Sequence, residues 1–369
     1  MRPSKKEIFI HVGHYKTGST AIQEFLHTHE KELAENGFLY PRVGRPKNNR
    51  NNHGHLSLSI ARQYGFNPPG WYRENISADE AFSAMLQEIE QTDAEKIIIS
   101  SEEFVQLALC AEPEVAIEDL KARLGEYDVT IVMYIREPLS LLKSWFNEVN
   151  KGPIGTRNFP TFFKNLNPHF LAQKKIYQRY ANAFGAQNLN VITYKNHGTE
   201  HIGEFLRAVN CSLRLPKYVP KTQVAQSLDT LEIARLAKDR RHSFEEATIS
   251  DILSIAKFQH KISRINTDYD QIANLSDAYH RSELSAVSII AHYADLLRPA
   301  RVFGPLNGGE AVNLRDLAIS VEDTDIELAL ALIEVAQIIR PNGDVIAAKV
   351  KEYNSRRGIE RELNTENKL

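Results

Sequence analysis

Short runs of apolar residues recur through the first half of the chain, and each run is followed by a longer amphipathic stretch. Four of these runs are rich in Ile and Val: Ile8–Val12, Lys96–Ser100, Val129–Ile135 and Leu189–Tyr194. Strands that are buried on both faces have such nearly continuous apolar sequences. Because strand and helix patterns alternate, we predict the α/β class, with a central parallel sheet flanked by helices.

Helical periodicity occupies the stretches between the strands and most of the second half of the chain. In the first half the predicted helices are Thr20–Asn36, Ala78–Thr92, Pro113–Gly125, Pro138–Asn150 and Leu171–Phe184. In the second half they are Leu228–Asp239, Phe244–His260, Asp277–Leu297 and Asp325–Arg340. We therefore expect an α/β domain over residues 1–215 and a mostly helical region over residues 216–369, with a charged tail that frays from Arg356.

Composition excludes several other classes of protein. Of the 369 residues, 42% are hydrophobic, which is enough apolar material for a large core. The 45 Lys and Arg residues nearly balance the 47 Asp and Glu residues, so we expect neither a nucleic-acid partner nor an anionic membrane surface. Cys110 and Cys211 are too few for a zinc site and are expected as buried residues in a reducing compartment. The apolar runs are too short for a signal peptide or a membrane span, so we expect a cytoplasmic protein.

A glycine-containing loop, Gly13–Thr20, lies between the first predicted strand and the first predicted helix. A loop in this position presents backbone N–H groups and a helix N-terminus to a phosphate. The separation of Gly13 and Gly18 matches the nucleotide-binding pattern G-x-x-x-x-G-K-[ST]. However, Ser19 stands where that pattern has lysine, and the lysine is three residues earlier, at Lys16.

A second candidate anion site follows the strand Val129–Ile135. This strand ends in Arg136, where a nucleotide triphosphatase has an acidic residue that holds Mg²⁺. An arginine at the carboxyl end of a parallel strand faces the ligand crevice, repels a metal ion and binds phosphate. Pro138 begins the next helix, and Ser144 lies about two helical turns along it. Two anion sites at one sheet edge predict a nucleotide phosphorylated at two places and bound without a metal.

These motifs resemble those of the sulfotransferase family. The segment His11–Thr20, of the form H-x-G-x-x-K-T-G-S-T, resembles the family's 5′-phosphosulfate loop. The segment Tyr134–Pro138, followed by Ser144, resembles its 3′-phosphate motif, and Ile99–Glu102 is also similar. The resemblance covers roughly the first 215 residues. It implies the donor 3′-phosphoadenosine 5′-phosphosulfate (PAPS), which carries phosphate at both ends, and transfer of its sulfuryl group to a hydroxyl without a metal.

The resemblance also implies roles for individual residues. Ligands of the 5′-phosphate would be Lys16, Thr17, Gly18, Ser19 and Thr20. Lys16 would also contact the bridging oxygen and stabilise charge on the leaving phosphate. The 3′-phosphate would be held by Arg136 and Ser144.

Transfer to a hydroxyl needs a base, and the sequence offers three candidates. Glu102 follows the strand Lys96–Ser100 and is placed as in glycan sulfotransferases of the family. Its neighbour Glu103 stays open as an alternative, and either glutamate could simply begin a helix. Small-molecule members use histidine, for which His53 is the candidate. We interpret the polar stretch 48–55 around it as a mobile loop at the acceptor entrance.

Two departures from the cytosolic small-molecule branch favour a glycan or bacterial enzyme. That branch has an adenine-stacking aromatic residue directly after the loop, where this chain has Ala21. It also has a lysine-containing glycine-rich motif near the C-terminus, which the turn sequence Gly304–Gly309 does not match. The expected acceptor is therefore a hydroxyl of a carbohydrate or glycolipid. The alternatives are a P-loop kinase that uses ATP·Mg²⁺ on a small metabolite, and a non-catalytic nucleotide-binding module.

Overall fold

The computed structural model describes residues 5–70, 72–151, 158–195, 198–215, 246–277, 279–300 and 308–366. The predicted helix Leu228–Asp239 lies outside these residues. The described residues form two compact units. The first contains those up to 137, those from 168 to 215 and those from 267 to 282. The second contains the described residues within 138–167, 246–266 and 283–366.

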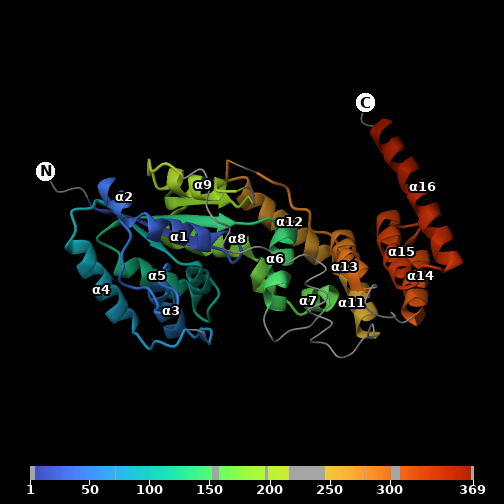
Figure 1. The fold of residues 1–369 in the computed structure, drawn as a ribbon, viewed down its shortest axis with the longest axis horizontal. Helices are drawn as coiled ribbons and strands as arrows, with labels where there is room; N and C mark the ends of the chain where they lie inside the picture. Colours follow the sequence, from blue (N-terminus) through green and yellow to red (C-terminus); the bar gives the residue numbers. More distant parts are fainter. Residues whose placement is uncertain are drawn as a thin grey trace. The chain divides into compact units, whose positions relative to one another are not determined.

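A five-stranded parallel sheet forms the centre of the first unit (Figure 1). Its strands are β1 (Glu7–Gly13), β2 (Phe38–Leu39), β3 (Lys96–Ser100), β4 (Asp128–Ile135) and β5 (Leu189–Thr193). They are arranged in the order β2-β3-β1-β4-β5, and each neighbouring pair is parallel. In the register, Ile8 lies between Ile97 and Val129. The predicted parallel sheet and its four long strands are confirmed, whereas β2 was not expected because two residues carry no periodic signal.

Helices cover both faces of this sheet, as predicted. On one face, Ile8, Ile10 and Val12 of β1 belong to a core to which several helices contribute. Among them are α3 (Gly54–Gln63), α4 (Ala78–Glu90), α5 (Pro113–Arg123) and α8 (Gln173–Phe184). On the other face, Phe9 packs with α1 (Ser19–Thr28), α2 (Glu30–Glu35) and α9 (Glu200–Ala208). Since successive side chains of β1 enter different cores, its apolar sequence is continuous.

Local sequence explains where individual helices begin and end. Ser77 and Glu80 form a capping box, with each side chain bonded to the other residue's backbone N–H, and α4 begins directly after Ser77. The predicted helix Thr20–Asn36 is instead divided into α1 and α2. The break falls at His29, which leaves helical geometry with φ −107° and ψ 26°.

The second unit consists of helices. They are α6 (Pro138–Lys151), α7 (Phe159–Lys164), α11 (Glu246–Lys257), α13 (Ala286–Ala300), α14 (Gly308–Val321), α15 (Ile326–Ile339) and α16 (Asp344–Glu366). The helix α12 (Gln259–Ala273) begins in this unit and ends in the first one. The central helix α15 is apolar on all sides and is buried by α13, α14 and α16. None of the helices in the described ranges is both long and apolar enough to cross a bilayer.

Two features of this arrangement differ from the sequence-based expectation. The units do not divide at residue 215, because α6 and α7 belong with the later helices, while the end of α12 packs Tyr269 and Ile272 into the core of the sheet. The tail does not fray from Arg356, because α16 continues to Glu366. Arg356 itself donates to the backbone carbonyl of Glu322 at 2.7 Å.

Candidate functional site

The loop between β1 and α1 has a geometry that depends on its small residues. A Cβ atom on Gly13 would lie 2.2 Å from Ser19 Oγ, so only glycine fits under that hydroxyl. Lys16 and Gly18 both have left-handed backbone geometry, with φ of 64° and 83°. Between them, buried Thr17 donates from Oγ1 to the carbonyl of His14 at 2.5 Å. The loop is therefore a tight, internally bonded turn.

The N-terminus of α1 fits an anion at this loop. No side chain caps the helix, because its N-cap residue is Gly18, and its first turn contains no acidic residue. The first N–H groups of an α-helix lack partners within the helix, and the helix dipole favours negative charge there. Ser19, which is buried, and Thr20, which is exposed, both lie in this first turn.

Several buried polar atoms at the loop have no hydrogen-bond partner among the described residues. They are Ser19 Oγ, His11 Nε2 and both ring nitrogens of His201. The His201 ring lies against the loop, since a Cβ on Gly18 would lie 2.9 Å from His201 Nε2. Buried polar atoms are almost always hydrogen-bonded in folded proteins. A cluster of unbonded hydroxyl and imidazole groups therefore fits a polar, anionic ligand.

Arg136 lies at the end of β4, and its main chain is held by the Gln173 amide. Gln173 accepts from the Arg136 N–H and donates to its carbonyl, both at 2.8 Å. The guanidinium donates to the carbonyl oxygen of Lys16 at 2.5 Å and lies 5.0 Å from the centre of the Tyr194 ring. The structure thus brings Arg136 to the β1–α1 loop.

Among the described residues Arg136 forms no ion pair with a carboxylate, although the charge of its neighbour Glu137 favours the charged guanidinium. Burial lowers the pKa of the guanidinium from its usual value. A partly buried cation without a carboxylate partner favours binding of an anion. Ser144, the other predicted 3′-phosphate ligand, lies on α6 in the second unit, and its role stays a prediction.

Glu102 and Glu103 follow β3 and begin a short 3-10 helix, η1 (Glu102–Ala108), close to the loop. Glu102 Oε2 accepts a hydrogen bond from Gln23 Nε2 of α1 at 2.8 Å. Glu103 Oε2 accepts one from the Tyr15 hydroxyl of the loop at 2.7 Å. Glu103 is therefore bonded to the loop that carries Lys16, and Glu102 to the helix that follows this loop, as expected for residues that follow adjacent parallel strands.

The environment of Glu103 changes its acidity. Its side chain is buried, with 5% of the residue exposed. Burial, followed by the charge of Glu102, raises the pKa of Glu103 to about 7, although the Tyr15 hydrogen bond opposes this rise. A carboxyl group with a pKa near neutrality is suited to general base catalysis.

The prediction of His53 as a base is wrong. Its Nδ1 accepts from the backbone N–H of Ser100 at 3.0 Å, and its Nε2 donates to the carbonyl of Pro41 at 2.9 Å. The ring is completely buried, and burial lowers its pKa to about 3. Both nitrogens are committed to backbone groups, so His53 holds the end of β3 and cannot take a proton from an acceptor.

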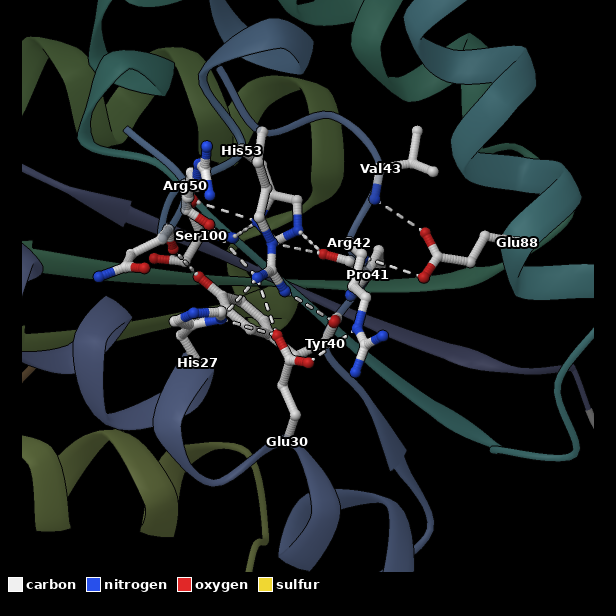
Figure 2. A network of polar contacts seen from close by, with 12 residues as sticks. His27, Glu30, Tyr40, Pro41, Arg42, Val43, Arg50, His53, Glu88 and Ser100 are labelled. Carbon is white, nitrogen blue, oxygen red and sulfur yellow. Dashed lines mark hydrogen bonds and ion pairs between the residues drawn. The ribbon is translucent and has the colours of Figure 1, made fainter. Parts of the chain in front are cut away.

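The stretch 48–55 is likewise not the mobile loop that its polar sequence suggested. Helix α3 begins at Gly54, and a network of polar contacts anchors the preceding segment to α1 and α2 (Figure 2). In this network Arg45 donates to Glu30 Oε1 at 2.8 Å and to the Tyr40 carbonyl at 2.9 Å. The Tyr40 hydroxyl donates to the Asn51 carbonyl at 2.5 Å. The second half of this stretch, residues 52–55, is buried, and this burial follows from contacts with residues distant in sequence.

Four residues at the site were not predicted from the sequence: Tyr15, Gln23, Tyr194 and His201. Tyr194 and Tyr15 could have been predicted from their positions in the sequence. Tyr194 directly follows β5 and Tyr15 lies shortly after β1, and ligands bind at the carboxyl ends of parallel strands. Nothing in the sequence identifies Gln23 or His201 as a site residue, because each is an ordinary polar residue within a helix. Within the described ranges, no three His, Cys, Asp or Glu side chains come together as metal ligands.

Comparisons with known proteins find a similarity among solved structures. No protein-family model matches the chain, and no curated protein matches it. Among solved structures, the chain is similar to a sulfotransferase from Alicyclobacillus acidocaldarius, with a TM-score of 0.39 and 14% sequence identity. The alignment covers 72% of this chain and 96% of that one. At this TM-score the likeness carries no weight for function, so the α/β assignment rests on the five-stranded sheet itself.

Proposed function

We propose that the protein is a sulfotransferase that moves a sulfuryl group from PAPS to an acceptor hydroxyl. One observation carries the proposal: Arg136 bonds to the carbonyl of Lys16 and has no carboxylate partner among the described residues. The guanidinium of Arg136, at the end of β4, thus reaches the backbone of the loop that carries Lys16, beside an uncapped helix N-terminus. This arrangement supports binding of a nucleotide with two anionic ends.

The loop would bind the 5′ end of the donor. The N–H groups of the first turn of α1 and the hydroxyls of Ser19 and Thr20 would contact the 5′-phosphate. Lys16 would contact the oxygen that bridges phosphorus and sulfur, where negative charge develops. Arg136, with Ser144 as the second predicted ligand, would bind the 3′-phosphate.

Sulfuryl transfer would then be an in-line displacement. The acceptor oxygen forms a bond to sulfur, and the bond between sulfur and the 5′-phosphate oxygen breaks. That oxygen keeps the electron pair, so the leaving group is adenosine 3′,5′-bisphosphate, stabilised by Lys16 and the α1 N-terminus. The acceptor proton passes to a carboxylate, Glu102 or Glu103, which contributes roughly 10²–10⁴ in rate. As part of the same proposal, the acceptor is a carbohydrate or glycolipid in a bacterial cytoplasm.

Calorimetric titration with adenosine 3′,5′-bisphosphate tests this proposal. We expect binding in metal-free buffer, and weaker binding in Lys16→Ala and Arg136→Ala. Arg42→Ala is the control, because this arginine pairs with Glu30 at the surface and its side chain is 80% exposed. Stronger binding of ATP with Mg²⁺ would instead support the kinase. Bisphosphate binding with no release of bisphosphate from PAPS, for any hydroxyl acceptor or for water, would support the non-catalytic module.

A further inference from the structure

The mechanism proposed above leaves one buried contact unused. Tyr15 immediately precedes Lys16 in the loop, and its hydroxyl donates to Glu103 Oε2 at 2.7 Å. The same hydroxyl accepts a hydrogen bond from Gln106 Nε2 at 2.5 Å. Tyr15 and Glu103 are separated by 88 positions along the chain, so this bond joins two distant segments. One of these segments carries Lys16, and the other carries the candidate bases.

We propose that Tyr15 is a positioning residue that holds the Glu103 carboxyl in place beside the phosphosulfate loop, and that Glu103 accepts the acceptor's proton. The inference rests on the proposed function and deepens it, because it selects one of the two glutamates and assigns a role to a loop residue outside the phosphate-binding set. Glu102 has a different partner, Gln23, whose position on α1 is beyond the loop.

Both ends of the Tyr15–Glu103 bond are fixed by further hydrogen bonds. The backbone N–H of Glu103 donates to Ser101 Oγ at 3.2 Å, and Ser101 Oγ lies 3.0 Å from Ser57 Oγ of α3. The N–H of Ser101 also donates to the His11 carbonyl of β1 at 3.3 Å. Because Gln106 orients the tyrosine hydroxyl, the loop and η1 form one connected polar network. Such a network gives the Glu103 carboxyl a defined position relative to Lys16.

The bond also affects protonation of Glu103. A hydroxyl that donates to a carboxylate stabilises the ionised form, which opposes the effects of burial and of the Glu102 charge. Three titratable side chains on elements packed against η1 have partners of their own: Arg179 pairs with Glu114, His55 bonds to Tyr72, and His11 bonds to Ser100. The hydrogen bond from Tyr15 is therefore the local interaction that favours the ionised form, the form that can act as a base.

The test measures the titration of Glu103 directly and needs no knowledge of the acceptor. Protein labelled with ¹³C at glutamate side-chain carboxyls is titrated by NMR, and the Glu103 resonance is assigned by its loss in Glu103→Gln. Tyr15→Phe removes the hydroxyl and keeps the ring. Because the ionised Glu103 carboxylate then loses a hydrogen bond, we expect the midpoint of the Glu103 titration to rise by about one pH unit. Tyr72→Phe is the matched control, because it removes a buried tyrosine hydroxyl that bonds to His55 instead.

Calorimetry with adenosine 3′,5′-bisphosphate on the same proteins separates this inference from the proposed function. If wild type binds the bisphosphate and Tyr15→Phe raises the midpoint while binding changes less than about threefold, the inference is supported. An unchanged or lower midpoint in a folded Tyr15→Phe protein overturns it, even where the bisphosphate still binds. If wild type does not bind the bisphosphate, the proposed function itself fails.

A second variant and a second readout complete the test. If Tyr15→Phe does not fold, Gln106→Leu is the second variant, because it removes the donor that orients the tyrosine hydroxyl. It should also raise the midpoint of the Glu103 titration, by a smaller amount than Tyr15→Phe. Slow hydrolysis of PAPS by water gives the second readout. Its rate should fall by about 10²–10⁴ in Glu103→Gln. Retention of wild-type hydrolysis in Glu103→Gln, with loss in Glu102→Gln, would assign the base to Glu102 and overturn the inference.

Discussion

Replacement of Gly13 by alanine tests the geometry of the loop directly. The added Cβ would lie 2.2 Å from Ser19 Oγ, so the serine hydroxyl must move. The next contacts, His11 Nε2 and Thr17 Oγ1, are both 3.2 Å away and need only small adjustments. Gly13→Ala should therefore lower the free energy of unfolding by about 1–3 kcal/mol, as for other overpacked sites. It should also displace the Ser19 hydroxyl from the anion site.

The affinity for adenosine 3′,5′-bisphosphate should fall with the loss of that hydroxyl. A hydrogen bond to a charged group contributes about 1.5–3 kcal/mol, which corresponds to a loss of roughly ten- to hundredfold in affinity. The decisive comparison is with Ser19→Ala. In that background the clash disappears, and Gly13→Ala should cost less than about 0.5 kcal/mol and cause no further loss of affinity.

Urea unfolding and calorimetric titration of the four proteins in this cycle provide the measurements. A large coupling between positions 13 and 19, in both stability and affinity, is the expected result. Equal losses from Gly13→Ala in the two backgrounds would refute the reasoning, because they would show that the Ser19 hydroxyl does not occupy the space above Gly13.

Three further predictions concern charge and burial. Arg136→Ala should weaken binding of adenosine 3′,5′-bisphosphate by roughly ten- to hundredfold in calorimetry, and urea unfolding should show a loss of about 1.5–3 kcal/mol, because the hydrogen bond from the guanidinium to the Lys16 carbonyl is lost. Glu103 has a folded pKa of about 7, above the ordinary 4.5, so its contribution to stability is present below pH 4.5 and is lost as the pH rises through 7. Relative to Glu103→Gln, wild type should therefore lose about 3 kcal/mol of stability between pH 4.5 and 8 in urea unfolding, and parallel pH profiles of the two proteins would contradict the assignment. His53→Ala should reduce the free energy of unfolding by about 2–4 kcal/mol through the loss of two buried hydrogen bonds, and a variant of normal stability that has lost PAPS hydrolysis would restore the histidine as a base.

The sheet and the loop could be predicted because their signals are local. β1, β3, β4 and β5 are buried on both faces, so each reads as a continuous apolar run, and the loop follows directly from the end of β1. Once the strands were placed, the rule that the carboxyl ends of parallel strands share one edge put Lys16 and Arg136 at the same edge of the sheet. In the structure the Arg136 guanidinium donates to the backbone carbonyl of Lys16.

The parts that could not be predicted depend on contacts between distant residues. His53 has the sequence neighbours of an exposed loop residue, and its burial depends on Ser100 and on the network around Arg45. The partner of Glu103 is a tyrosine that belongs to another loop, and no spacing rule links the two. The division into units depends on how apolar helix faces pair, which the periodicity of each helix alone does not reveal.

The central position of β1 also governs when the site can form during synthesis. β1 is among the first segments made, but its partners Ile97 and Val129 follow roughly 90 and 120 residues later. Until β4 has emerged from the ribosome, the loop after β1 has neither Arg136 nor a complete sheet beneath it. At about 5–20 residues per second, that delay lasts many seconds. The loop and the apolar β1 are therefore not covered by the whole sheet until β4 has been made, and the nucleotide site forms together with the sheet.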